Sequence, residues 1–247
     1  MYPELIIPNN THPNKLYAFP LVGLVIKIIL VIPAYIVYAV VGFISGVFLL
    51  ITPFVILFKG KYWDKSYEWN INFFIYGAKI QLYLTGISDK YPGFTLEPNG
   101  MFEMHLPKPE SPSRLMAFPV GGFIGRYIIM FPYLLFLSVL SYVMHAAVVF
   151  SWFAVWIKGT YPESLYEFIR DELRVSLAYD AYMAYLSDTY PSSKISMNHK
   201  KIKIALIIIG TIVTLAYFGN KINQIAHPTH DSSYYNSTSN TTDSSGY

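Results

Sequence analysis

The chain has 247 residues, of which 53% are hydrophobic, 17% aromatic and only 13% charged. A soluble domain usually carries about 25% charged residues, so we expect much of this chain to face lipid. The formal net charge of +3 does not suggest a nucleic-acid-binding protein. Because the chain contains no cysteine, disulfides, thiolate metal sites and a cysteine nucleophile are excluded.

Two runs of apolar residues dominate the sequence. They cover 28–58 and 127–157, and each is longer than the roughly 20 residues that cross a bilayer as a helix. A shorter apolar run follows at 204–219. These runs predict an all-α integral membrane protein.

The chain is a tandem repeat with a period of 99 residues. When residues 2–92 are aligned with residues 101–191 without a gap, 22 of the 91 positions are identical. The identities include polar motifs between the apolar runs, such as Ser-Asp-x-Tyr-Pro at 88–92 and 187–191. Chance matches between two apolar runs would not produce them. We therefore expect two tandem repeats of one fold, at 2–95 and 101–194.

The apolar segments of the two copies lie at 18–58 and 117–157. Each would be about 60 Å long as a single helix, which is twice the hydrocarbon thickness of a bilayer. We therefore expect each to fold back as a transmembrane helical hairpin, with a break within 38–46 or 137–145.

The hairpin keeps Lys27 and Lys59 on one side of the membrane, as the positive-inside tendency prefers. The alternative is one long tilted helix, preceded by a surface helix that reaches Pro33 or Pro132. Gly42 and Gly46 form a GxxxG pattern, which suits close helix packing in either arrangement.

A Lys-Gly pair ends each apolar segment, and an amphipathic segment follows it. Lysine favours the negative end of a helix, and glycine tolerates the left-handed backbone after it. We expect interfacial amphipathic helices at 63–90 and 162–189, each ended by Tyr-Pro because proline disfavours helix in the residue before it. The residues to which we assign a structural role at the starts and ends of these helices are Gly60, Gly159, Glu68, Glu167, Asp89, Asp188, Pro92 and Pro191.

Short extended pieces at 4–7, 94–106 and 193–197 predict a few short β-strands on the membrane surface. The basic cluster NHKKIK precedes a predicted C-terminal transmembrane helix at 203–222. We expect the N-terminus and the surface helices to be cytoplasmic. The tail at 227–247 is rich in Ser, Thr and Asn, so we expect it to be disordered and outside the cell.

The second copy carries KGTYPESLYEF at 158–168 and LRVSLAYDAYMAYLSDTYP at 173–191 after an apolar run. This pattern resembles an uncharacterised prokaryotic membrane family, domain-of-unknown-function family 4389, which often occurs as two tandem copies. The first copy departs from the pattern at Trp63, which replaces a proline, and the second lacks the Pro-Phe that usually ends the motif. The resemblance implies an architecture and a bacterial or archaeal plasma membrane, but no chemistry.

Lys27 and Arg126 occupy matching positions eight or nine residues into the apolar segments, where a cation is costly. One hypothesis is a symmetric pair of charged sites for a lipid headgroup or an ion. The simpler interpretation is that both side chains snorkel to the headgroups. If they are buried, their partners stand at matching positions, either the glutamates 68 and 167 or the aspartates 89 and 188. The residues that we assign to a headgroup or a partner protein are Lys27, Arg126, Lys59, Lys158, Arg170 and Arg174.

His145 shares a helical face with Ser138 and Ser141, which favours packing or an interhelical hydrogen bond over a metal site. No nucleotide-binding, zinc or nucleophile motif is present in the sequence. We therefore assign no catalytic residue, no metal ligand and no cofactor, and we expect that the protein is not an enzyme.

These features lead to one functional hypothesis and one alternative. We expect a non-catalytic membrane-surface scaffold or accessory subunit, with two parallel copies about a pseudo-twofold axis normal to the membrane. Its partners would be membrane lipid and a partner membrane protein or a second copy, but no nucleic acid. The alternative is a small transporter or channel that uses Lys27 and Arg126 as paired intramembrane cations. An enzyme acting on lipids lacks a constellation of catalytic residues.

Overall fold

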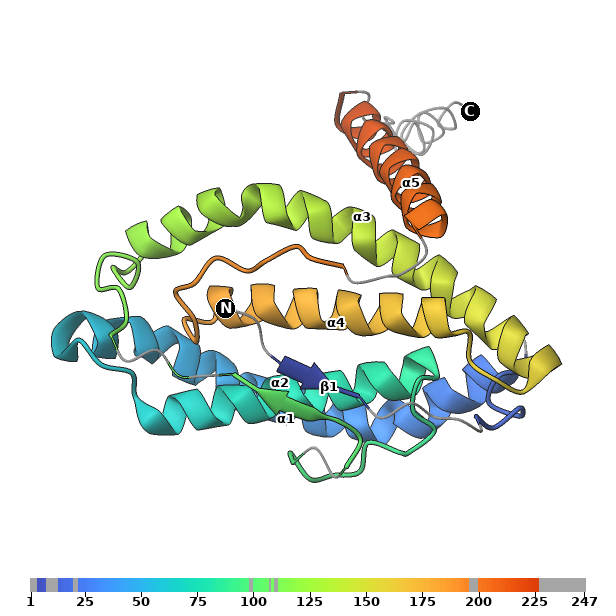
Figure 1. Ribbon diagram of the computed structural model, residues 1–247. Helices are drawn as coiled ribbons and strands as arrows, with labels where there is room; N and C mark the ends of the chain where they lie inside the picture. Colours follow the sequence, from blue (N-terminus) through green and yellow to red (C-terminus); the bar gives the residue numbers. More distant parts are fainter. Residues whose placement is uncertain are drawn as a thin grey trace, which may run out of the picture.

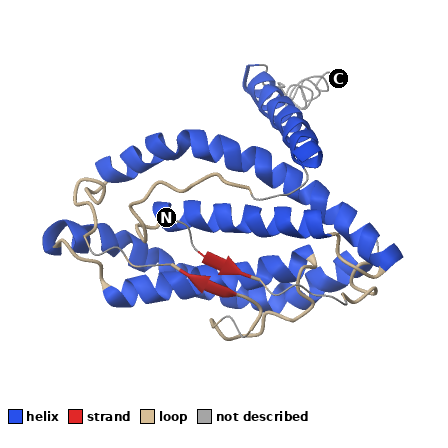
Figure 2. Cartoon of the chain, viewed as in Figure 1, coloured by secondary structure: helices blue, strands red, loops and turns tan. Residues whose placement is uncertain are grey.

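The computed structural model describes residues 4–7, 13–19, 22–97, 100–106, 108, 111–195 and 200–226. Within these residues the chain is mainly helical, with one two-stranded sheet (Figures 1 and 2). In chain order the elements are β1 (Glu4–Ile6), α1 (Val22–Lys59), α2 (Asp64–Thr85), β2 (Glu103–His105), α3 (Gly121–Lys158), α4 (Glu163–Met183) and α5 (Lys200–Ala226).

The repeat predicted from the sequence is present in the structure. Helices α1 and α3 each have 38 residues, and both of their bounds differ by 99. Each long helix packs against the shorter helix that follows it, α1 against α2 and α3 against α4. The first copy is therefore an antiparallel helix pair, and the second copy repeats it (Figure 1).

The transmembrane hairpins predicted at 18–58 and 117–157 are wrong, because each long helix is continuous. A break would have left backbone groups of two new helix ends without partners. Glycine inside a helix costs only about 1 kcal/mol, and Gly42 gives room for the Phe73 ring, which would lie 3.0 Å from an added Cβ. In the second copy the hydroxyl of Ser138 donates to Leu134 O of the preceding turn, so it supports the helix.

The predicted ends of the helices at 63–90 and 162–189 are also corrected. α2 and α4 end at Thr85 and Met183, several residues before the Tyr-Pro pairs at 91–92 and 190–191, so the prolines do not end them. Most residues of α2 and α4 are buried or half-buried, which makes these helices the core of each copy. Strands form only at 4–6 and 103–105, while the described parts of 94–102 and 193–195 contain no strand.

The register of the sheet relates the two copies by a pseudo-twofold axis. β1 and β2 are antiparallel, with Leu5 opposite Met104, which is its own equivalent 99 residues later. The neighbouring pairs, Glu4 with His105 and Ile6 with Glu103, exchange under the same shift. A twofold axis through the central pair produces this register, so the sheet is a symmetric joint between the copies.

Two tyrosines repeat this exchange outside the sheet. The Tyr67 hydroxyl of the first copy donates to Leu106 O of the second, at 2.9 Å. The equivalent Tyr166 hydroxyl of the second copy donates to Ile7 O of the first, at 2.5 Å.

The long helices run antiparallel, so the start of each lies near the end of the other (Figure 1). Near the start of α1, the Phe19 ring packs edge-on against Trp156, with centroids 5.3 Å apart. Near the start of α3, Ile56 and Tyr62 share a buried cluster with Ala117. The two copies thus hold each other at both ends of the molecule.

Helix α5 crosses α3 instead of extending along it (Figure 1). A Cβ at Gly210 would lie only 2.3 Å from Val143 Cγ2, so the crossing requires glycine there. The Tyr142 and Tyr217 rings pack beside this crossing. The disordered tail predicted at 227–247 lies outside the described residues.

Each copy places one tyrosine hydroxyl on the same backbone carbonyl, but from a different helix. In the first copy Tyr76 of α2 donates to Gly93 O at 2.8 Å, beside Ala34 of α1. In the second copy the equivalents are reversed, because Tyr133 of α3 reaches Ser192 O at 3.3 Å beside Val175 of α4.

Moving the tyrosine of the first copy from α2 to α1, its position in the second copy, tests whether the two cores are equivalent. We expect A34Y alone to overfill the first core and Y76V alone to leave a cavity, each costing about 2 kcal/mol or more. The double variant A34Y/Y76V should recover at least about 1 kcal/mol of the summed loss. Thermal unfolding in detergent, followed by far-ultraviolet circular dichroism, measures the coupling. Strictly additive losses would show that the two cores do not correspond.

Candidate functional site

Lys27 and Arg126 lie six residues into α1 and α3, and the side chain of each is only 1% exposed. The snorkelling interpretation therefore does not agree with the structure. Each cation instead joins three segments of its own copy. We call these clusters the cation hubs: Lys27, Tyr83 and Asp89 in the first copy, and Arg126, Tyr182 and Asp188 in the second.

The first cation hub is centred on the Lys27 ammonium. It donates to Tyr83 O at 2.9 Å and lies 3.7 Å from Asp89 Oδ1. It also lies over the Tyr17 and Tyr83 rings, at 5.6 and 5.1 Å from their centroids. These contacts replace the hydration that a buried ammonium loses.

The second cation hub has the same plan with a guanidinium. Arg126 donates to Tyr182 O, to Ser187 O at 3.2 Å and to Asp188 Oδ1 at 2.5 Å. Its guanidinium carbon lies 4.7 and 4.4 Å from the Tyr182 and Tyr185 ring centroids. Arginine has more donors in a fixed plane than lysine, which explains the extra bond to Ser187.

The aspartates also hold the loop that precedes each long helix. Asp89 Oδ2 accepts from the Asn14 backbone N–H at 2.6 Å, and Asp188 Oδ2 accepts from Ser113 N–H at 2.7 Å. Our prediction that Asp89 and Asp188 end a helix is wrong, because the helices end earlier, at Thr85 and Met183. The alternative that they are the partners of the buried cations is confirmed. The sequence signal for this role was their fixed spacing of 62 residues from the cations.

A residue with a left-handed backbone conformation lies between the companion helix, α2 or α4, and the aspartate of each cation hub. In the first copy it is Gly86, with φ of 80°, and a Cβ there would lie 3.1 Å from Trp152 Nε1. In the second copy the same position is Tyr185, with φ of 62°. A side chain is strained in this conformation, and the contact between the Tyr185 ring and Arg126 offsets that strain.

The other predicted residues fall into separate places. Lys59 and Lys158 are exposed in the last turns of the long helices, and Gly60 and Gly159 follow with φ of 66° and 75°, as we predicted for these helix ends.

Glu68 and Glu167 lie in the second turns of α2 and α4, whereas the first turns carry Asp64 and Glu163. Arg170 and Arg174 lie 3.2 and 3.3 Å from the buried carboxylate of Asp171. Neither the glutamates nor the arginines of α4 belong to a cation hub.

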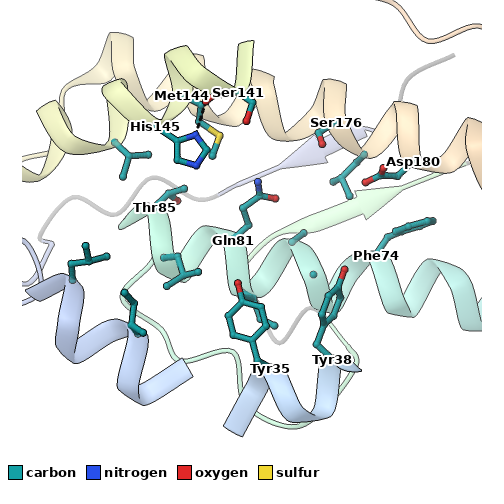
Figure 3. A pocket seen from close by; sticks show the side chains of 18 of the residues that line it. Tyr35, Tyr38, Phe74, Gln81, Thr85, Ser141, Met144, His145, Ser176 and Asp180 are labelled. Atoms are coloured by element: carbon teal, nitrogen blue, oxygen red, sulfur yellow. Dashed lines mark hydrogen bonds between the residues drawn. The ribbon is translucent and has the colours of Figure 1, made fainter. Parts of the chain in front are cut away.

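A groove with a volume of about 600 Å³ lies between the two copies (Figure 3). All four helices α1 to α4 contribute to its wall, but neither Lys27 nor Arg126 does. The cations therefore do not face one another around a shared cavity, which was the arrangement expected for a transporter. The sequence analysis did not find this groove.

Part of the groove wall comes from equivalent positions of the two copies. Gln81 of α2 corresponds to Asp180 of α4, and Gly77 corresponds to Ser176. Figure 3 shows the Gln81 side chain extending into the groove, with Ser176 and Asp180 on the wall opposite. His145 also lines the groove, and its Nδ1 lies 2.7 Å from Ser141 O. The hydrogen bond of His145 therefore lies within α3 and is not the interhelical bond that we expected.

Glu172 lies two turns before Asp180 on the same face of α4, so the two carboxyls and Ser176 form a polar stripe at spacings of four residues. Burial and the charge of Asp180 raise the pKa of Glu172 to about 7. Burial raises the pKa of Asp180 to about 6. The spacing of these residues was the only signal of the stripe in the sequence. No group of three or more His, Asp or Glu residues that could hold a metal ion occurs among the described residues.

The fold and the cation hubs define a duplicated helical protein, with one long apolar helix and one buried companion helix in each copy. The model of the family described as Domain of unknown function (DUF4389) matches residues 22–95 and 122–193, and the chain belongs to this family. The two matches coincide with the two copies. The chain has no match among the curated proteins or the solved structures with which it was compared.

Removing the carboxylate from a cation hub should destabilise the protein. We expect D188N and D89N each to cost roughly 2 kcal/mol, because a buried cation loses its counter-charge while the aspartates are themselves partly exposed. At this chain length the loss corresponds to about 4–8 °C in Tm. Thermal unfolding in detergent measures it, with the exposed-site variant E68Q as the control. An unchanged Tm in both variants would contradict the structural role of the hubs.

Glu172 should make stability depend on pH. Its pKa is about 7 in the folded chain, above the ordinary value of 4.5, so the folded state holds the proton more tightly and loses stability as pH rises from 4.5 to 7. E172Q removes this loss. We expect the variant and the parent to have equal Tm near pH 4. By pH 8 the free energy of unfolding of the variant should exceed that of the parent by up to about 3 kcal/mol, with a higher Tm. A constant difference in Tm across this range would contradict the assignment.

Proposed function

We propose that the protein is a non-catalytic membrane protein that lies in one leaflet of a bilayer and acts as a scaffold or accessory subunit at the membrane surface. The observation that carries this proposal is the exposed apolar face of α1 and α3. On α1 the large exposed side chains continue from Val25 to Phe58, and on α3 they continue from Phe123 to Ile157. Apolar surface of this extent on a single chain is typical of a protein that contacts lipid.

The charges lie away from this face. Residues 28–58 contain no charged side chain, and residues 127–157 contain none except for His145. Many exposed charged residues of the described chain lie beside the ends of the long helices or in the segment that contains β2, for example Lys15, Lys61, Lys90 and Glu103. This separation favours one apolar face in the acyl chains and one charged face in the headgroups and water.

The lengths of α1 and α3 argue against a transmembrane orientation, although both are long and apolar enough to cross a bilayer. Each is about 57 Å long, and fitting that length within hydrocarbon about 30 Å thick requires a tilt of about 60°. Membrane helices are tilted by about 0–40°. Helices that lie in the plane of the membrane avoid this mismatch.

The segment between α2 and α3 gives a second argument. The end of α2 lies beside Trp152, because the Trp152 indole donates to Thr85 O at 3.2 Å. The start of α3 is 31 residues before Trp152, or about 46 Å along the helix. Residues 86–120 must cover this distance, and their only regular structure in the described part is β2. Charged, non-helical chain does not cross lipid.

In this orientation the exposed lysines 59 and 158 lie at headgroup depth, where they can pair with lipid phosphates. The pseudo-twofold axis is normal to the membrane, and the sheet faces the water, where it is available to a partner protein. Helix α5, which crosses α3, is then the segment that passes through the bilayer.

Labelling of single cysteines tests the orientation, and the absence of native cysteine makes each substitution unique. We place cysteine at the exposed positions 15, 59, 114 and 158, which mark both ends of both long helices. In-plane helices should leave all four positions reactive to a membrane-impermeant maleimide from the same side of sealed vesicles. Reaction at position 15 from one side and at position 59 from the other would show that α1 spans the membrane. Full labelling after detergent solubilisation controls for reactivity.

A further inference from the structure

The groove between the copies has the size and lining of a ligand site. Its volume of about 600 Å³ falls within the range of about 300–1,000 Å³ for small-molecule sites. Most of its wall is apolar, with residues such as Leu24, Met144 and Val148. The exposed apolar residues Ile28, Tyr35 and Val149 also line it, so the groove is continuous with the apolar face of α1 and α3.

The polar wall of the groove is acidic. Asp180 lines it, and no lysine or arginine is among its lining residues. Among the described residues, none donates a hydrogen bond to Asp180 or forms an ion pair with it. Glu172 continues the polar stripe one turn beyond Ser176, and its Oε2 atom is buried without a hydrogen-bond partner in the described chain. Glu172 does not line the groove, so Asp180 is the carboxylate that a cation or a hydrogen-bond donor in the groove would satisfy.

The aromatic residues around the acid favour a cation. Tyr35 and Tyr38 point from α1 toward the groove in Figure 3, and Trp152 lines it from α3. Burial and, to a smaller extent, the charge of Asp180 raise the pKa of the Tyr38 hydroxyl. An ammonium group between a carboxylate and aromatic faces gains both a charge contact and cation–π contacts.

We propose that the groove binds an amphiphile with an alkyl chain and an ammonium head, with the chain against the apolar wall and the ammonium at Asp180. The absence of lysine and arginine from the lining disfavours fatty acids and anionic lipids. Such an amphiphile is either a free long-chain amine or an aminophospholipid. A bilayer source rests on the membrane attachment proposed above, whereas binding itself does not.

Titration of the full chain in detergent with three probes of equal chain length tests the head preference. The probes are dodecylamine, dodecanol and dodecanoate, and tryptophan fluorescence reports binding because Trp152 lines the groove. We expect dodecylamine to bind about tenfold more tightly than dodecanol, as a charge-assisted hydrogen bond implies, and dodecanoate to bind most weakly. Lysophosphatidylethanolamine is the fourth probe: its binding identifies an aminophospholipid, and binding of the amine alone identifies a free amine.

Two variants locate the ammonium. D180N should reduce dodecylamine affinity by about tenfold and leave dodecanol affinity unchanged. D180N/Q81E moves the carboxylate to the equivalent position of the other copy and should restore the preference for the amine. E68Q, at an exposed site outside the groove, is the matched control. Far-ultraviolet circular dichroism confirms that each variant is folded.

Two results would overturn the proposal. Equal affinities for dodecylamine and dodecanol would show that the groove recognises only the apolar chain. An unchanged amine preference in folded D180N would show that the ammonium is not held by this carboxylate. Neither result bears on the labelling of positions 15, 59, 114 and 158, so this proposal and the in-plane orientation can fail separately.

Discussion

A buried cation near the start of each long helix is the interaction on which each copy depends. Lys27 and Arg126 lose their hydration, so each must be surrounded by acceptors. The last turn of the companion helix supplies a carbonyl, from Tyr83 or Tyr182, at the negative end of that helix. The aspartate beyond this helix supplies the counter-charge and binds the preceding loop. These contacts bring the end of the companion helix to the start of the long one, which is the antiparallel pair seen in both copies.

The two pairs are then joined by contacts that exchange between the copies. The sheet register places equivalent residues opposite each other, and Tyr67 and Tyr166 each bond to a carbonyl of the other copy. Because these contacts are symmetric, they fix the axis that relates the copies, and equivalent positions of α2 and α4, such as Gln81 and Asp180, face the same groove. The apolar faces of α1 and α3 lie at the two sides of the groove. The same symmetry therefore positions the proposed lipid-facing surface and the proposed ligand site.

The sequence predicted the repeat, the helical class and the Lys-Gly helix ends, because these depend on local patterns. It failed where the outcome depends on tertiary partners. The hairpins were inferred from bilayer thickness, which constrains a helix only if it crosses the membrane. The aspartates at 89 and 188 were one of two candidate pairs of partners for the cations, and the structure confirms that pair. The sequence could not select them over the glutamates at 68 and 167, and their position before Tyr-Pro also indicated a helix end. The groove combines four helices with no shared motif.

The copies differ in the position of the side chain that donates to a shared backbone carbonyl. Each must satisfy the same backbone carbonyl after its companion helix. Lys79 of α2 donates to Thr95 O at 2.7 Å, whereas Arg174 of α4 donates to the equivalent Lys194 O at 3.1 Å. The tyrosines 76 and 133 exchange helices in the same manner. The two copies share the carbonyl that needs a hydrogen-bond donor, but the donor comes from a different sequence position in each copy. The acidic residue of the groove has a separate origin, because position 180 is aspartate where the first copy has Gln81, and neither lysine nor arginine lines the groove.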